Sequence, residues 1–177
     1  MSLDSSLIKN LWNYSDNLKE KYGIEDAFRG LEKKYLLNRN IIIFCCWLAK
    51  QQYEPLTTQL LKPMLVRITP WHEKIVIELL SLKNSLPKVT QHHELKGLFQ
   101  SIDKNVIYAE RVEQSLLVKY LYEMKTSQCD ESQQINNALS NIFKYIEATG
   151  AVIHKTDLEK VYRIVKNSFD ENRDGQK

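Results

Sequence analysis

The chain has little glycine, proline or cysteine, and each shortage excludes a class of protein. Five glycines and four prolines among 177 residues are too few for the many tight turns of an all-β fold. The three cysteines are an odd number, and Cys45 and Cys46 are neighbours, so they offer no disulfide framework. Hydrophobic residues make up 43% of the chain, which excludes general disorder. The composition therefore predicts a helical protein in a reducing compartment, the cytoplasm.

The sequence also lacks a long apolar run and an excess of charge of one sign. Its longest run, residues 41–49, has nine residues, where a bilayer span needs about 20. The N-terminus has no basic segment followed by an apolar stretch, so we expect no signal peptide. The net charge of +3 is spread along the chain and forms no basic stripe on one element. We therefore expect no membrane association, and the sequence argues against nucleic-acid binding.

The run from Ile41 to Ala49 is the strongest positive feature. It has no polar interruption, so a helix that carries it must be covered on all sides. Asn38 precedes the run, and its side chain can accept a hydrogen bond from one of the free N–H groups of the first turn. We therefore predict an all-α fold: a single-domain bundle of seven to eight helices around a buried central helix.

Hydrophobic residues spaced three and four apart predict the other helices. Two prolines are expected to interrupt this pattern. Helices are expected at about 4–22, 24–35, 38–52, 56–68, 70–86, 91–125, 133–148 and 156–169. Pro63 should kink or split its helix, and Pro70 should begin the next one. In that next helix the apolar residues are expected to point inward, namely Trp71, Ile75, Leu79 and Leu82.

The helix at about 91–125 is the predicted spine of the bundle, roughly 50 Å long if unbroken. We expect residues 1–126 to form a helical core domain that contains this spine. Residues 127–177 are expected to be a C-terminal extension of two helices packed on the core, with a tail that frays from about residue 171.

Several short motifs, in a fixed order, give the chain a resemblance to a known family. They are Leu11-Trp12-x-Tyr14-Ser15, Tyr22-Gly23-Ile24-Glu25, Leu31-Glu32, the segment from Asn40 to Leu48, and the segment from Tyr108 to Leu116. Together they resemble a family of small proteobacterial helical proteins known only as a conserved domain of unknown function, over about Leu11 to Leu121. The family pattern is Trp-x-x-Ser, then Tyr-x-Gly-Val-Glu, then Asn-x-Leu-Leu-Phe-Cys-x-Trp-Leu. The resemblance implies a helical fold and a bacterial cytoplasm, and it implies no mechanism.

Two carboxylates of the predicted spine are the best candidates for a site. Glu113 falls on the apolar stripe between Ala109 and Leu116, and Glu110 lies one turn earlier. A carboxylate that faces a core costs several kcal/mol unless it is paired or hydrogen-bonded. Partners that the sequence offers to Glu113 are Arg39, Asn40, Lys83 and Arg111. Glu113 is thus either a structural clamp between helices or a buried acid in a ligand pocket.

Metal and thiol chemistry have little support in the sequence. A di-iron helical bundle needs Glu-x-x-His pairs, and none of the four histidines has a glutamate three residues before it. Cys45 and Cys46 lie between Phe44 and Trp47, where a reactive thiol would need a basic and partly exposed setting. We therefore expect no catalytic residues, no metal site and no cofactor.

Three interpretations of function remain open. The leading one is a non-enzymatic, cytoplasmic protein-interaction module that binds another protein or a second copy of itself. The alternative is a small-molecule-binding or catalytic pocket near Glu110, Arg111 and Glu113, closed by Asn40 and Trp47. The third and weakest is a nucleic-acid-associated protein.

Overall fold

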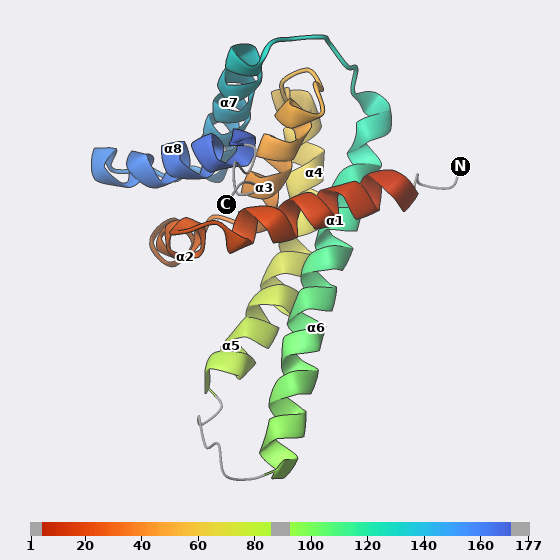
Figure 1. The fold of residues 1–177 in the computed structure, drawn as a ribbon, viewed down its shortest axis with the longest axis vertical. Coiled ribbons are helices and arrows are strands. Elements are labelled where there is room, and N and C mark those ends of the chain that lie inside the picture. Colours follow the sequence, from red (N-terminus) through yellow and green to blue (C-terminus); the bar gives the residue numbers. More distant parts are fainter. Residues whose placement is uncertain (1–4, 86–92, 171–177) are drawn as a thin grey trace, which may run out of the picture.

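The computed structural model describes residues 5–85 and 93–170, and every regular element in this part of the chain is a helix (Figure 1). The elements are α1 (Ser5–Glu20), α2 (Ile24–Tyr35), α3 (Arg39–Lys50), α4 (Thr58–Trp71), the π-helical turn η1 (His72–Val76), α5 (Ile77–Ser85), α6 (His93–Val118), the 3₁₀ turn η2 (Lys119–Glu123), α7 (Glu131–Thr149) and α8 (Lys155–Phe169). The predicted all-α single-domain bundle is confirmed.

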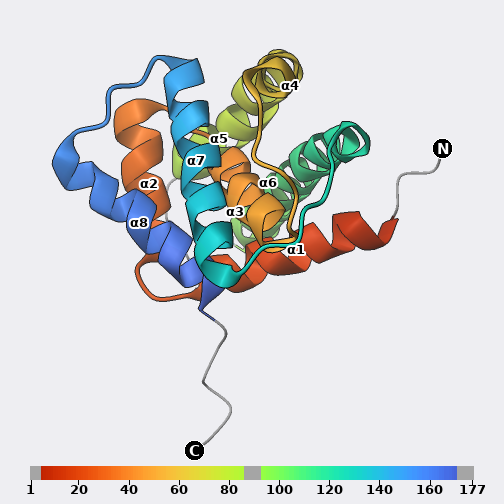
Figure 2. The ribbon, with the colours of Figure 1, turned by 90° about the horizontal axis from the view of Figure 1, so that it is seen from above.

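Helix α3 is the centre of the bundle, as its apolar run predicts. Every residue from Asn40 to Ala49 is buried, and α1, α6, α7 and α8 all contact the helix. Figure 2 shows α3 enclosed between these neighbours. The predicted cap is confirmed, because Asn38 Oδ1 accepts a hydrogen bond from Asn40 N at 2.8 Å.

Helix α4, the π turn and α5 follow one another without a break, so the predicted split at Pro63 and the new start at Pro70 are wrong. Both prolines lie inside α4. Each lacks an N–H and so removes one backbone hydrogen bond, which usually bends a helix without ending it. The π turn begins two residues after Pro70, and Ile77 N bonds to His72 O across it. This wider turn adds one residue and so rotates all later side chains by about 100°.

The predicted spine is present as α6, which runs antiparallel beside α5 (Figure 1). The α-helical part ends at Val118 and tightens into η2, which ends at Glu123. Residues 91–92 of the predicted spine lie outside the described residues. The tail from residue 171, for which fraying is expected, also lies outside them.

Residues 72–85 and 96–111 form a two-helix arm that extends away from the body of the protein (Figure 1). We call these residues the arm. No residue of α5 is buried. The prediction that this helix turns its apolar side inward is wrong for Ile75 and Leu82, which are 38% and 47% exposed. The reason is that α5 runs beyond the body and, among the described helices that lie beside it, has only α6 to pack against.

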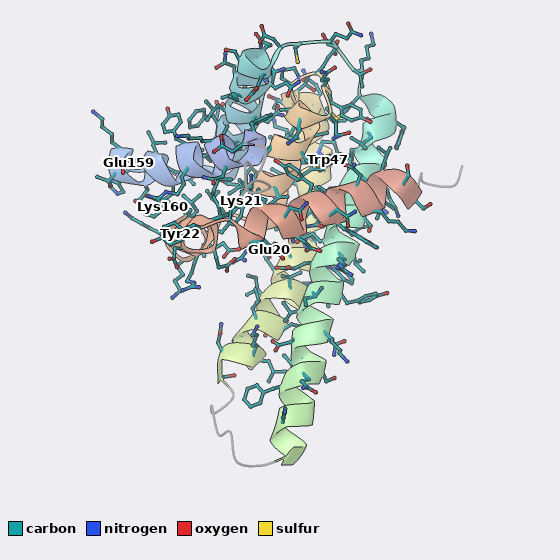
Figure 3. All side chains as sticks on the ribbon, viewed as in Figure 1. Glu20, Lys21, Tyr22, Trp47, Glu159 and Lys160 are labelled. Atoms are coloured by element: carbon teal, nitrogen blue, oxygen red, sulfur yellow. The ribbon has the colours of Figure 1, made fainter. Side chains whose placement is uncertain are left out.

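Helices α7 and α8 cover the other side of the bundle. Helix α7 packs mainly on α3, and α8 packs on α2. Buried side chains of α7 and α8, such as Ile142 and Ile164, belong to the same cluster as those of α3. Lys21, labelled in Figure 3, holds the end of α8, because its Nζ donates to the backbone oxygens of Asn167 and Asp170 at 2.6 Å each.

A carboxylate near the start of α8 also joins it to α2. Asp157 Oδ2 accepts from Lys34 Nζ at 2.6 Å and from the Tyr35 hydroxyl at 2.7 Å, and Oδ1 accepts from Lys160. These donors lower the pKa of Asp157 far below its usual value, with Lys160 as the largest cause. The carboxylate therefore stays ionised and keeps α8 attached to α2 at neutral pH.

None of the described helices is long and apolar enough to cross a membrane.

Candidate functional site

Glu113 lies at the middle of the bundle with a side chain that is completely buried. Its two carboxylate oxygens accept hydrogen bonds from two side-chain amides. Asn38 Nδ2 donates to Oε1 at 2.7 Å, and Asn40 Nδ2 donates to Oε2 at 2.5 Å. Of the partners that the sequence offered, Asn40 is the one that Glu113 contacts.

The two asparagines reach Glu113 because of where α3 begins. Asn38 is the N-cap and Asn40 is in the first turn, so both amides project from the same end of a helix whose residues from Ile41 to Ala49 are apolar. The Asn38 side chain uses its oxygen for the cap and its nitrogen for Glu113. One residue thus satisfies both a helix end and a buried carboxylate, two groups that would each cost free energy without a partner.

The hydrogen bonds continue from Glu113 across the bundle. Asn40 Oδ1 accepts from Gln114 Nε2 at 2.9 Å, and the same nitrogen is 2.9 Å from the Ser15 hydroxyl on α1. On the other side, Asn38 N donates to the Tyr145 hydroxyl on α7 at 2.8 Å. The network therefore connects α1, α3, α6 and α7 through side chains that are almost entirely buried.

His72 adds a titratable group beside Glu113. It opens the π turn, and its Nδ1 lies 3.1 Å from Glu113 Oε1 without the alignment of a hydrogen bond. Among the described residues it is the only basic side chain within 4.0 Å of that carboxylate. The side chain is 13% exposed, so His72 separates the buried carboxylate from solvent. π turns are frequent at functional positions in helices.

The other candidate residues are not gathered around Glu113. Glu110 Oε2 pairs with Lys19 Nζ at 2.8 Å, towards α1. Arg111 lies at the surface, with its Nη2 3.3 Å from Asp16 Oδ2 and its guanidinium over the Trp12 ring. Trp47, labelled in Figure 3, donates from Nε1 to Asn10 Oδ1 at 2.7 Å. The five predicted residues thus separate into one pair, Asn40 with Glu113, and three contacts elsewhere.

The remaining cations that the sequence offered to Glu113 have other partners. Arg39 donates from Nε and Nη2 to Glu32 at 2.5 Å and from Nη1 to Glu25 at 3.0 Å. Burial opposes the charge on Arg39, but the Glu32 and Glu25 carboxylates outweigh it and raise the pKa of the guanidinium. Lys83 is paired with Asp103 at 2.7 Å.

The paired cysteines are unreactive in this setting. Both are fully buried in α3, and burial raises the pKa of Cys46 to about 12 and that of Cys45 well above its usual value. A thiol that stays protonated at neutral pH is neither a nucleophile nor a metal ligand. In the described part of the chain no three acidic, histidine or cysteine side chains are grouped so that they could hold a metal ion.

The arrangement around Glu113 suits a structural role better than acid–base chemistry. A general acid or base must reach a substrate proton, but both oxygens of Glu113 are engaged and the side chain has no exposed surface. His72 is the one member of the group with access to solvent. The network can therefore fix the relative positions of four helices.

Sequence reasoning missed His72, Gln114 and the second role of Asn38. From the sequence, His72 is a candidate only for a metal ligand and Asn38 only for a helix cap. The spacing Asn38-x-Asn40 directly before the apolar run 41–49 is a usable signal, because two buried amides at one helix end require hydrogen-bond partners. The approach of His72 depends on the π turn, which no sequence pattern indicated.

Comparison with known proteins gives one match. The sequence profile of a family described as proteins of unknown function, DUF2390, matches residues 10–117. No curated protein matches the chain, and no solved structure matches it. The match starts in α1 and ends one residue before the end of α6, close to the range of the resemblance found in the sequence, and it includes Ser15, Asn38, Asn40, His72 and Glu113. It covers more than half of the chain, which therefore belongs to the DUF2390 family of proteins of unknown function.

Proposed function

We propose that this protein is a protein-interaction module and that the arm is its docking element. The observation that supports the proposal is the uneven distribution of exposed apolar side chains. The described part of the chain has thirteen large hydrophobic residues that are exposed, and six of them are in the arm: Ile75, Ile77, Leu82, Leu98, Ile107 and Tyr108. Single exposed hydrophobic residues are normal on a protein surface, whereas a cluster of them marks an interaction site.

The shape of the arm favours docking as well. The two antiparallel helices of the arm pack against each other along one face of each helix. The outer sides of both helices therefore remain available to another protein. In α5 the contact with α6 leaves Ile77 and Leu82 with nearly half of their surface exposed. Covering each such side chain would contribute on the order of 1 kcal/mol, since full burial of a leucine or isoleucine contributes about 1.5–3 kcal/mol.

The two alternative functions receive less support. A pocket built on the spine carboxylates would need Glu110 and Glu113 to face one space, but Glu110 pairs with Lys19 and both oxygens of Glu113 accept from asparagines. Nucleic-acid binding would need a basic surface. The arm, which is the most protruding element, carries four acidic and five basic residues.

The proposal places the protein in the bacterial cytoplasm. The three cysteines support a reducing compartment, since all are free and none lies in a disulfide. The bacterial origin follows the resemblance noted in the sequence.

Photo-crosslinking in cells tests the proposal. A photoreactive amino acid at Leu98, in the arm, should give covalent adducts with another protein chain after irradiation. The same amino acid at Val152, which is 82% exposed but lies between α7 and α8, is the matched control and should give few adducts. Adducts that form equally from both positions, or from neither, would contradict the proposal.

A further inference from the structure

The exposed apolar residues of the arm lie on two opposite sides of it. Val76, the last residue of η1, and Val106 on α6 are buried and mark the faces where the two helices of the arm meet. Relative to these faces, the helical repeat of 100° per residue puts Leu82 and Leu98 on one side of the hairpin and Ile77 and Ile107 on the other.

The side that carries Leu82 and Leu98 is the more continuous of the two, and we call it the leucine side. Ile75 in η1 and Leu79 and Leu82 in α5 follow one another at spacings of four and three residues, so they form one stripe along residues 75–82. On α6 the neighbouring positions on this side of Leu98 are Ser101 and Asn105, which carry no charge. The leucine side is therefore an apolar stripe with an uncharged polar border.

We propose that the leucine side of the arm binds the same side of a second copy of this chain, so that two arms form a four-helix bundle. The inference rests on the proposed function, and it names the partner. A hairpin of two helices buries only one face of each helix, and a second hairpin of the same kind covers the remaining apolar faces in a four-helix bundle. Two identical chains meet in this way about a twofold axis, with the same surface on both sides of the interface.

Charge supports a second copy as the occupant. A surface that binds itself must not carry an excess of one sign, because like charges would then face each other across the twofold axis. The arm has four acidic and five basic residues, and Lys83 is already neutralised by Asp103 at 2.7 Å. A partner that was strongly acidic or strongly basic would find no complementary field here.

Sedimentation velocity of the full chain over a range of concentrations tests the inference. The wild-type protein should shift from monomer to dimer as its concentration rises. The double variant Leu82→Glu and Leu98→Glu puts two charges into the proposed interface and should weaken the dimer at least about tenfold. The matched control is Ile77→Glu with Ile107→Glu, which makes the same kind of change at similar exposure on the opposite side and should leave the dimer constant unchanged.

A second variant covers the case in which the double variant does not fold. Asn105→Glu replaces an exposed polar residue on the leucine side and should weaken the dimer without affecting folding. A wild-type protein that stays monomeric at every concentration would overturn the second copy as partner, as would a dimer that both double variants weaken equally. A protein that does not dimerise but still forms crosslinks from Leu98, and few from Val152, would overturn the second copy as partner and leave the proposed function standing, so the two failures can be told apart.

Discussion

Helices α3 and α5 are both short and rich in isoleucine and leucine, yet they differ completely in exposure. All residues of α3 from Asn40 to Ala49 are buried, whereas α5 has no buried residue. In α3 the apolar run is uninterrupted, and four other helices cover it. In α5 the apolar residues alternate with Glu78, Ser81 and Lys83, and α6 is the only helix that the structure describes alongside it. The comparison shows that apolar content alone does not mark a core, because the number of covering elements decides what is buried.

The largest expected difference between the two helices is in stability. Ile42→Ala removes a fully buried side chain from α3 and should lower the free energy of unfolding by about 2–5 kcal/mol. Ile77→Ala makes the same change in α5, where the side chain is 43% exposed, and should change it by less than about 0.5 kcal/mol. Urea denaturation of both variants measures this difference. Equal losses would contradict the distinction between a covered helix and an uncovered one.

A smaller difference is expected within α6, where it leaves the arm and enters the body. Glu113→Gln replaces one carboxylate oxygen with an amide nitrogen, so one asparagine donor loses its acceptor. The free energy of unfolding should fall by about 1–3 kcal/mol, with a loss of about 2–4 °C in Tm for each kcal/mol. Removing a buried charge offsets part of this loss.

Glu110→Gln is the control for that change. Glu110 is 9% exposed and accepts a hydrogen bond from Lys19 Nζ. Because a glutamine oxygen can still accept this hydrogen bond, the free energy of unfolding should fall by only about 1 kcal/mol. Thermal unfolding that is affected more by Glu110→Gln than by Glu113→Gln would show that the hydrogen bonds around Glu113 contribute little to the bundle.

The attachment of α8 to the body gives the smallest effect, and it depends on pH. Lys160, Lys34 and Tyr35 lower the pKa of Asp157 in the folded protein. The stability that Asp157 contributes is therefore present above its unfolded pKa of about 3.9 and is lost as pH falls below that value. The melting temperature of Asp157→Asn should consequently fall less steeply with acid than that of the wild type. Parallel curves for the two proteins between neutral and acidic pH would contradict this.

The sequence predicts the body well because its signals are local. The uninterrupted run from Ile41 gives the buried helix, Asn38 gives its cap, and the order of the motifs gives the family. The sequence predicts α4 and α5 poorly because their conformation depends on tertiary contacts. Pro63 and Pro70 lie inside a helix that its packing on α6 and α7 stabilises, a compensation that propensity does not contain.

The candidate site shows the same limit. That Glu113 needs a partner follows from its position on an apolar stripe, and Asn40 is one of the partners that the sequence offers. That Asn38 also donates to Glu113, and that His72 comes within 3.1 Å of it, depends on how α3 and the π turn meet α6. The exposure of the arm could not be foreseen either, since Ile75 and Leu82 have the spacing of a buried stripe, yet both are exposed and no element within residues 5–85 and 93–170 covers them.

Hydrogen exchange at a low and a high protein concentration tests the central claim most directly, namely that the body is complete in one chain and the arm is not. The account predicts slower exchange at high concentration in residues 77–85 and 96–111, with unchanged exchange in α3 and α7. Exchange that does not depend on concentration anywhere, or that slows in α7 and α8 and not in the arm, would contradict it.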